Sequence, residues 1–329
     1  MRVLYHILYP EGMGDDRFTY EGYLDAFTDL GHIVFALTEK DDINEIFNRV
    51  KPDLFVGEGN FLMEDFSRQA SLLKSFRKNG GKVVLHGAMS DWLAKEIRRE
   101  SMIDRYFSEV DTTVEFPDFP PSLFCKMHWL AASRHYHSPV PPNEKYRCDI
   151  LYVGANLPRK RVAFKNLLLP LRKKYHVKIF GGDWDWLDRY FLHPMAKIDR
   201  ELNLGGIVSR LRINRQVPIN EENIAYSSAK ICINITESHP HTPLKLINAR
   251  TFKIPASGGF EVCDYVPQLR EFFAEDEVIM PLTQSEWFEK IDYYLHNETA
   301  RKVIQEKGTK RAFSNHTFHS RVQQIFKEL

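Results

Sequence analysis

The sequence has few cysteines, almost no net charge and no long apolar run. Its four cysteines show no CxxC or zinc-finger spacing, and Cys232 and Cys263 lie in apolar runs typical of buried thiols. The 45 Lys and Arg residues nearly balance 44 Asp and Glu residues, so no overall field directs the chain to nucleic acid or membranes. No apolar run is long enough to span a bilayer, and Met1 leads directly into a strand-like segment, without a signal peptide. We therefore expect a cytoplasmic protein in a reducing compartment.

Several familiar catalytic motifs are also missing. The sequence contains no nucleophile elbow, Walker loop, HExxH motif or EF-hand loop. Gly12 and Gly14 lack the third glycine of a dinucleotide-binding fingerprint. These absences argue against α/β-hydrolase, P-loop and zinc-protease chemistry.

The order of apolar segments predicts an α/β protein with two doubly wound domains. Strand-like runs at 2–9 and 33–37 flank an amphipathic helix at 17–30, which is a βαβ unit and implies a parallel sheet. The alternation continues to residue 99, and a second series begins at residue 149. Between them, the segment 111–142 holds six of the seventeen prolines, which break helices and strands. We therefore predict domains at 1–145 and 146–312 with a closing helical segment at 313–329, and ligands at the carboxyl ends of the strands.

The most distinctive stretch runs from Asn248 to Tyr265. We expect a short helix with Leu244, Leu246 and Ile247 on its buried side, ended by Pro255, which lacks a backbone N–H. Gly258 and Gly259 follow, and then the strand-like run 260–263. Glycine has no side chain and tolerates positive φ, so this stretch suits either a tight turn or the close approach of backbone to a bound group.

This stretch resembles the signature R-T-F-E-I-P-A-C-G-G-F-x-x-x-D-Y of the CgeB-like (spore maturation type) glycosyltransferases. The resemblance implies a group-1 enzyme of the GT-B fold, with two Rossmann-like domains facing a central cleft and the nucleotide-sugar donor held by the C-terminal domain. The resemblance is strong over 149–320 and weaker before that. The matching positions are Arg250, Thr251, Phe252, Ile254, Pro255, Ala256, Gly258, Gly259, Phe260, Asp264 and Tyr265.

Two positions depart from the signature. Ser257 stands where the family usually has Cys. Lys253 stands where the family usually has Glu, the residue expected to hold the hydroxyls of the donor ribose. A lysine only donates hydrogen bonds and carries the opposite charge, so the usual bond from a carboxylate to the diol is lost at Lys253.

The resemblance also implies a set of donor-binding residues. The loop 154–161 follows a strand and opens a helix, where cations and the helix dipole favour phosphate, and the alternative is a solvated charge run. From the family pattern we expect Arg159 and Arg250 to act in catalysis by stabilising the leaving diphosphate. The expected donor-binding residues are Gly154, Arg161, Gly182, His241, Lys245, Asn248, Thr251, Lys253, Gly258 and Gly259.

The N-terminal domain offers candidates for orienting or deprotonating an acceptor hydroxyl. Asp15, Asp16, Glu58 and His86 all lie at or after predicted strand ends, and we select Asp16 and His86. Asp183 and Asp185 spell the acid-x-acid pattern by which another glycosyltransferase fold binds a divalent metal. Because this tripeptide is a short motif with many false positives, we predict no metal and no cofactor beyond a nucleotide-sugar co-substrate.

The sequence therefore predicts a metal-independent glycosyltransferase that uses a nucleotide sugar, most simply a UDP-sugar, and an acceptor that is a glycan, small molecule, protein or nucleic acid. One alternative is a non-catalytic nucleotide- or sugar-binding protein, because Lys253 replaces the family Glu. Another is a glycosyltransferase that modifies DNA bases, because the basic clusters 172–174 and 210–215 could follow phosphates. Near-neutral total charge argues against that second alternative.

Overall fold

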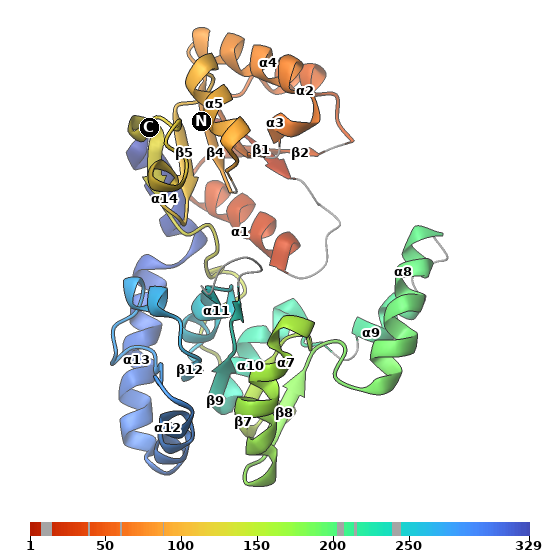
Figure 1. Cartoon of the computed structure of the whole chain (residues 1–329), viewed down its shortest axis with the longest axis vertical. Helices are drawn as coiled ribbons and strands as arrows, with labels where there is room; N and C mark the ends of the chain where they lie inside the picture. Colours follow the sequence, from red (N-terminus) through yellow and green to blue (C-terminus); the bar gives the residue numbers. More distant parts are fainter. Residues whose placement is uncertain are drawn as a thin grey trace. The chain divides into compact units, whose positions relative to one another are not determined.

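The computed structural model describes residues 1–7, 15–38, 40–59, 61–87, 89–202, 207–213, 216–238 and 245–329 (Figure 1). The chain forms two compact units, one of residues 1–131 and 317–329 and the other of residues 132–316. Residues 132–145 belong with the second unit, since Val140 N and Asn143 N donate to the hydroxyls of Ser227 and Ser228. Each unit is a parallel sheet covered by helices on both faces, as the βαβ pattern predicted.

Unit 1 contains a six-stranded sheet with the order β2-β1-β3-β4-β5-β6, and all its pairs are parallel. Parallel neighbouring strands need a crossover connection, and the helices that alternate with the strands along the chain supply it. Strands β5 and β6 were not predicted from the sequence, and they lie in or beside the segment that was expected to be irregular. The strands are β1 (Arg2–Ile7), β2 (Ile33–Thr38), β3 (Leu54–Glu58), β4 (Lys82–His86), β5 (Arg105–Ser108) and β6 (Phe124–Lys126).

Helices cover both faces of this sheet. One face packs Leu4, Phe55 and Leu85 against α2, α4 and α5. On the other face α1 lies beside α14, and a Cβ placed on Gly22 would come within 2.1 Å of the Phe318 ring. His319 also pairs with Asp29 at 2.9 Å, so the last helix completes unit 1. The helices are α1 (Asp15–Asp29), α2 (Ile43–Val50), α3 (Phe61–Glu64), α4 (Phe66–Lys78), α5 (Asp91–Glu100), α6 (Thr112–Glu115) and α14 (Phe318–Glu328).

Unit 2 contains a four-stranded parallel sheet with the order β12-β9-β7-β8. The chain leaves β7 toward β8 on one side and returns to β9 on the other, so the strand order reverses between β7 and β9. A crevice at the carboxyl ends of strands forms at such a reversal. The strands are β7 (Cys148–Val153), β8 (Val177–Phe180), β9 (Ala229–Asn234) and β12 (Glu261–Cys263), with a separate antiparallel pair β10 (Glu237–Ser238) and β11 (Lys245–Leu246).

The helices of unit 2 divide between the two faces of its sheet. Phe164, Leu168 and Trp287 pack on one face, and Tyr226 and Ile254 pack on the other. After α7 the chain continues as a π-helical turn at 164–168 and a 3-10 turn at 169–173, which contains Pro170. The helices are α7 (Arg161–Ala163), α8 (His193–Glu201), α9 (Ile207–Ile213), α10 (Glu222–Ser228), α11 (Arg250–Ala256), α12 (Gln284–His296) and α13 (Glu298–Asn315).

Two local predictions for the signature stretch were wrong. Lys245–Leu246 pairs with Glu237–Ser238 as a short hairpin instead of forming a helix. Helix α11 begins only at Arg250, and Pro255 lies inside it, one residue before its end. The helix ends in a glycine cap instead, because Gly258 has φ +73° and the N–H groups of Gly258 and Gly259 donate to Pro255 O and Ile254 O.

Candidate functional site

Asn234 organises the carboxyl end of the sheet in unit 2. Its Oδ1 accepts from Asn248 Nδ2 at 2.9 Å and from Arg250 Nε at 3.2 Å. Its Nδ2 donates to Thr251 Oγ1 at 3.1 Å and to Glu261 Oε1 at 2.8 Å. Both acceptor sites and both donors of this buried amide are therefore used. Asn234 brings together three of the predicted residues, and sequence reasoning missed it, although a polar residue that ends an apolar strand was a usable signal.

Arg250 joins the ends of the two strands at which the order reverses. Its Nη1 donates to Val153 O of β7 at 2.8 Å, and its Nη2 donates to Ile235 O, just after β9, at 3.2 Å. Its guanidinium carbon lies 5.2 Å from the centre of the Tyr152 ring. These contacts aim several of its donors at the protein, so we infer that Arg250 chiefly positions the strand ends and supplies positive charge.

Gly154 leaves the space that the Arg250 side chain occupies. A Cβ placed on Gly154 would lie 2.2 Å from Arg250 Nη1, and one placed on Gly181 would lie 2.1 Å from Gly154 O. Trp184 Nε1 donates to Gly154 O at 2.7 Å, and Gly182 O accepts from Asn156 N at 2.9 Å. The loops after β7 and β8 are therefore held against each other by direct backbone contact.

Lys160 is the inward-facing cation of the loop after β7. It is 4% exposed, whereas its neighbours Arg159 and Arg161 are exposed to solvent. Its Nζ lies 3.5 Å from Glu237 Oε1. Burial and the nearby charge of Arg250 lower the pKa of Lys160 to about 8, although Glu237 opposes both effects.

The three arginines that we expected to act together do not meet. Arg250 lies at the strand ends, while Arg159 and Arg161 point outward from the helical turn. Side chains of consecutive residues in a helical turn point in different directions. Among these three cations only Lys160, the last residue of the 3-10 turn Pro158–Lys160, is buried. The sequence did not single out Lys160, because the residue at which the 3-10 turn begins determines which of the three cations faces inward.

Lys253 forms a buried ion pair rather than facing solvent. It is 3% exposed, and its Nζ lies 3.3 Å from Glu222 Oε2. His137 Nε2 lies 3.1 Å from the same oxygen. The carboxylate beside Lys253 therefore belongs to Glu222 of α10, and the two side chains form a charged pair. Sequence reasoning missed Glu222, which is distant from the signature in sequence.

Packing accounts for both signature glycines. Gly258 has φ +73°, and a Cβ there would lie 3.1 Å from Pro139 Cβ. A Cβ on Gly259 would lie 2.8 Å from Ile254 Cγ2. Gln305 also donates to Gly258 O. The tight-turn interpretation therefore describes these two glycines, which are buried within unit 2.

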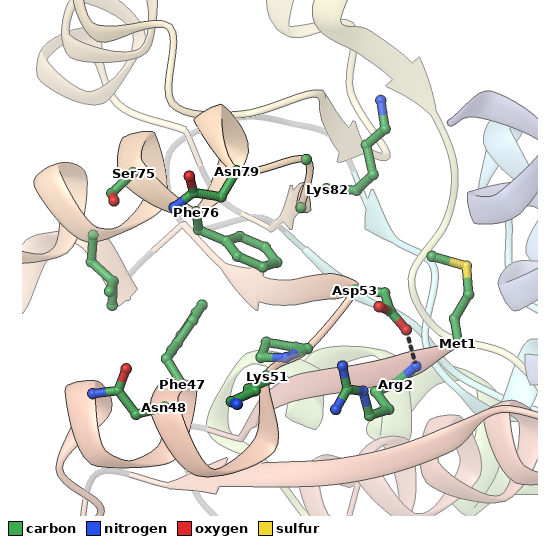
Figure 2. Close-up of a pocket in the computed structure, with 14 residues that line it drawn as sticks. Met1, Arg2, Phe47, Asn48, Lys51, Asp53, Ser75, Phe76, Asn79 and Lys82 are labelled. Atoms are coloured by element: carbon green, nitrogen blue, oxygen red, sulfur yellow. Dashed lines mark hydrogen bonds between the residues drawn. The ribbon is translucent and has the colours of Figure 1, made fainter.

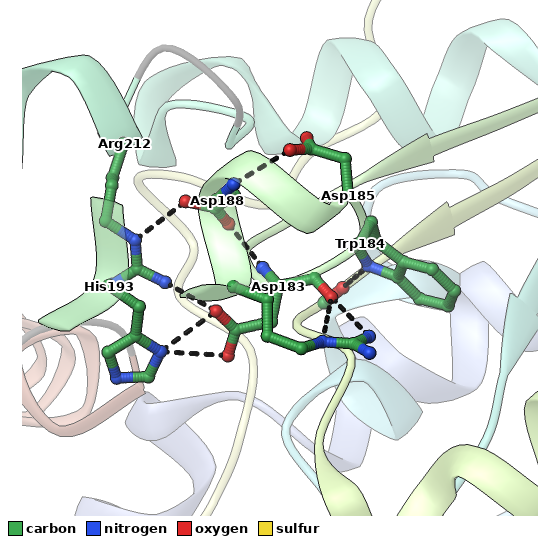
Figure 3. A network of polar contacts seen from close by, with 8 residues as sticks. Asp183, Trp184, Asp185, Asp188, His193 and Arg212 are labelled. Atoms are coloured by element: carbon green, nitrogen blue, oxygen red, sulfur yellow. Dashed lines mark hydrogen bonds and ion pairs between the residues drawn. The ribbon is translucent and has the colours of Figure 1, made fainter. Parts of the chain in front are cut away.

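Asp183 belongs to an ionic network (Figure 3). Its Oδ1 lies 3.1 Å from Arg212 Nη2 and 2.9 Å from His193 Nδ1. Arg212 Nε donates to Asp188 Oδ1 at 2.9 Å. Asp185 instead accepts from the backbone N–H of Asp188. Within the described parts of the chain, no three His, Cys, Asp or Glu side chains are grouped to hold a metal ion.

In unit 1, His86 is buried at the carboxyl end of β4. Its ring stacks on Trp129 with centroids 3.4 Å apart. Burial lowers the pKa of His86 well below its usual value, and nearby His6 adds to this effect. None of the described residues hydrogen-bonds its Nε2. The imidazole of His86 is therefore neutral at pH 7, and its lowered pKa makes it a weak base.

Three other predicted residues are described incompletely. His241 lies outside the described residues. Lys245 lies in β11 and Asp16 in α1, but their side chains are outside the described part of the structure. Their expected roles remain predictions.

Two cavities of unit 1 lie at opposite edges of its sheet. The larger, of about 610 Å³, lies where β1 and β4 begin and is lined by Arg2, Lys51 and Lys82 among others (Figure 2). The smaller, of about 230 Å³, lies at the carboxyl ends of β1 and β2 and is lined by His6 and Phe61 among others. Since ligands of doubly wound sheets bind at the carboxyl ends of the strands, the smaller cavity is better placed to bind a ligand.

The sequence matches one protein family. A family described as "Glycosyl transferase-like" matches residues 159–327. A comparison with curated proteins found no match. Within the described residues, no helix has the length and apolar character needed to cross a membrane.

Solved structures share the fold over nearly the whole chain. A glycosyltransferase from Rickettsia africae is 13% identical with a TM-score of 0.65, covering 99% of this chain and 98% of that one. A sucrose-phosphate synthase from Thermosynechococcus elongatus is 11% identical with a TM-score of 0.61, covering 100% and 98%. HepE from Anabaena, solved with UDP and glucose, is 10% identical with a TM-score of 0.58, covering 100% of both chains. These likenesses confirm the predicted GT-B fold of two Rossmann-like domains.

Proposed function

Because the chain belongs to the glycosyl transferase-like family, we propose that it moves a sugar from a nucleotide-sugar donor to an acceptor hydroxyl. The match confirms the predicted enzyme class. A UDP-linked donor is supported by the contents of similar structures, since HepE was solved with UDP-glucose and an α-glucosyltransferase with UDP-glucose and DNA.

One observation carries the proposal: Arg250 and the buried Lys160 lie together where the strand order of unit 2 reverses. Arg250 bridges the ends of β7 and β9, and its charge lowers the pKa of Lys160. Two nearby cations with little access to water are costly unless an anion compensates them. Glu237 and the buried Asp264 offset part of this charge, and a diphosphate at the edge where such sheets bind ligands would be attracted by the two cations.

In the proposed reaction, the bond between the anomeric carbon and the diphosphate oxygen breaks, and the acceptor oxygen bonds to that carbon. Lys160 and backbone N–H groups of the 154–161 loop would stabilise the negative charge that develops on the leaving diphosphate. Arg250 would hold the loop and strand ends in place. The acceptor proton would leave to a base, for which Asp16 and His86 remain the predicted candidates. The roles of the outward-facing Arg159 and Arg161 would be limited to the approach of the donor.

Calorimetric titration tests the donor site. We expect UDP to bind the full chain, and Lys160→Gln to weaken that binding about tenfold or more because a charged hydrogen bond is lost. Uridine, which has no phosphate, should bind both proteins equally weakly. Lys165→Gln is the matched control, since Lys165 is an exposed lysine of the same helical run. Absence of binding for UDP and for a panel of nucleotide sugars would contradict the proposal.

A non-catalytic binding protein is the second candidate, because Lys253 is paired with Glu222 and offers no carboxylate to a ribose. Under our proposal Glu222 would take over the contact with the ribose hydroxyls. Hydrolysis or transfer assays with UDP-sugars separate the two candidates. Saturable UDP binding without any turnover of a donor panel would favour the binding protein.

We further propose the CgeB-like subtype, from the signature at 250–265, with a cytoplasmic location and no metal requirement. Domains at 1–145 and 146–312 and a closing segment at 313–329 remain our proposed functional division. Transfer to DNA is a narrower alternative supported by one similar α-glucosyltransferase, solved with UDP and a 13-mer DNA. Retention on duplex DNA that weakens steeply with salt would support it.

A further inference from the structure

Glu261 is a carboxyl group in a strand that is otherwise apolar and buried. It opens β12, and its neighbours Phe260, Val262 and Cys263 are all buried. Glu261 itself is only 2% exposed, and burying a polar group costs free energy unless hydrogen bonds compensate it. Among the described residues, it has a single hydrogen bond, from Asn234 Nδ2 to its Oε1 at 2.8 Å, and its Oε2 has no partner. The polar contact of Glu261 is therefore directed at Asn234 alone.

The register of the sheet places Glu261 beside Asn234. Residue 261 of β12 pairs with residue 232 of β9, so the side chain of Glu261 lies on the same face as those of Cys232 and Asn234. Ile254 of α11 packs with Cys232 on this face. Glu261 is therefore on the face that α11 covers, and α11 is the helix that begins at Arg250.

Asn234 links Glu261 to Arg250. The amide donates from its nitrogen to Glu261, and its oxygen accepts from Arg250 Nε at 3.2 Å. Since a guanidinium group only donates, turning the amide by half a rotation would bring two donors together and leave Arg250 Nε without its acceptor. Glu261 and Thr251 Oγ1 hold the amide nitrogen on the other side of the group. Glu261 therefore restrains the amide in the orientation that Arg250 requires.

Glu261 accepts this hydrogen bond without adding a full negative charge at neutral pH. Burial raises the pKa of Glu261 to about 8, although the hydrogen bond from Asn234 and the charge of Arg250 oppose the shift. The carboxyl group is therefore mostly protonated at pH 7. An ionised carboxylate at this position would offset part of the positive charge of Arg250, which attracts the donor diphosphate under the proposed function.

We propose that Glu261 is a positioning residue of the donor site, because its carboxyl group restrains the Asn234 amide and thereby keeps Arg250 on the ends of β7 and β9. The proposal rests on the proposed function, in which that edge of the sheet binds the diphosphate of the donor. It assigns a role to a position that the signature at 250–265 leaves open. An apolar residue at position 261 would suit the strand but would leave Thr251 as the only acceptor for Asn234 Nδ2.

Calorimetric titration of two variants of the full chain with UDP at pH 7 tests the proposal. Glu261→Met keeps an unbranched side chain but removes the acceptor, so we expect the dissociation constant for UDP to rise about fivefold, because Arg250 is held less firmly. Glu261→Gln keeps an uncharged acceptor and should bind UDP within about twofold of the parent protein. Uridine should bind all three proteins equally weakly, since it has no phosphate for Arg250 to attract.

Val262→Ala is the control for a general loss of stability. Val262 is fully buried on the opposite face of β12, so its truncation should lower the midpoint of urea denaturation while UDP affinity stays within about twofold. Glu261→Met should show the reverse pattern. Its UDP binding should be weaker, but its midpoint should stay close to that of the parent, because a buried group without a partner is removed along with one hydrogen bond.

Exchange of the Arg250 Nε–H proton with water, followed by NMR, tests the positioning role without any ligand. We expect faster exchange in Glu261→Met than in the parent or in Glu261→Gln. Exchange or UDP affinity that is equal in Glu261→Met and the parent would overturn the role of Glu261, and so would Glu261→Gln that binds as weakly as Glu261→Met. Absence of UDP binding to the parent would contradict the donor site itself, and the exchange rates would still decide the role of Glu261.

Discussion

The carboxyl ends of the two parallel sheets have opposite chemistry. In unit 2 this edge gathers cations, with Lys160 and Arg250 near Glu237. In unit 1 the same edge carries neutral imidazoles, because burial lowers the pKa of His6 to about 4 and that of His86 well below its usual value. The two units share a βαβ plan, so the different charge of the two edges comes from the side chains at the strand ends.

The largest loss of stability should come from removing the guanidinium group of Arg250 in unit 2. Arg250→Met leaves Val153 O, Ile235 O and Asn234 Oδ1 without that donor, so we expect unfolding in urea to show a loss of about 4 kcal/mol. Arg172→Met, at an exposed arginine of the same unit, should change the free energy of unfolding by less than about 0.5 kcal/mol. A loss of similar size in both variants would contradict the bridging role of Arg250.

A slightly smaller loss should follow from reversing the charge of Lys253. Lys253→Glu places two carboxylates in one buried place beside Glu222, and we expect a cost of about 3 kcal/mol. Adding Glu222→Lys to Lys253→Glu should restore part of the stability, as urea denaturation would measure. If the single change were neutral, the ion pair between Lys253 and Glu222 would not contribute to stability.

The affinity for UDP should depend on pH through Lys160, at the carboxyl edge of the sheet in unit 2. Since the pKa of Lys160 is lowered to about 8, the lysine is charged at pH 7 and mostly neutral at pH 9. Bound diphosphate favours the charged form, so UDP affinity should fall about tenfold from pH 7 to pH 9. Calorimetry on Lys160→Arg is the control, because arginine keeps its charge and should remove most of this fall. A flat profile in the parent protein would separate Lys160 from the donor.

The smallest effect on UDP binding should come from replacing His86, at the carboxyl edge of the sheet in unit 1. His86→Phe keeps an aromatic ring on Trp129, so the free energy of unfolding should change by about 1 kcal/mol. UDP affinity should stay within about twofold, because no charge is removed. Transfer to an acceptor should nevertheless fall if His86 takes the acceptor proton. Unchanged turnover in this variant would exclude that role.

The sequence alone determined the fold class, because the period of its apolar residues and the positions of glycine and proline are local properties. The βαβ alternation and the signature at 250–265 were sufficient to predict a glycosyltransferase of the GT-B fold. The same local signals misplaced the start of α11, since pairing of Lys245–Leu246 with Glu237–Ser238 overrides helix propensity there.

Only the tertiary structure decided which side chains meet. It selected Lys160 from three consecutive cations, assigned Glu222 as the partner of Lys253, and joined Asn248, Arg250 and Thr251 through Asn234. It also buried Asp183, Asp188 and Arg212 in one network and left the nearby Trp186 and Tyr190 exposed. These choices depend on contacts between segments far apart in the chain, which no local pattern of residues encodes.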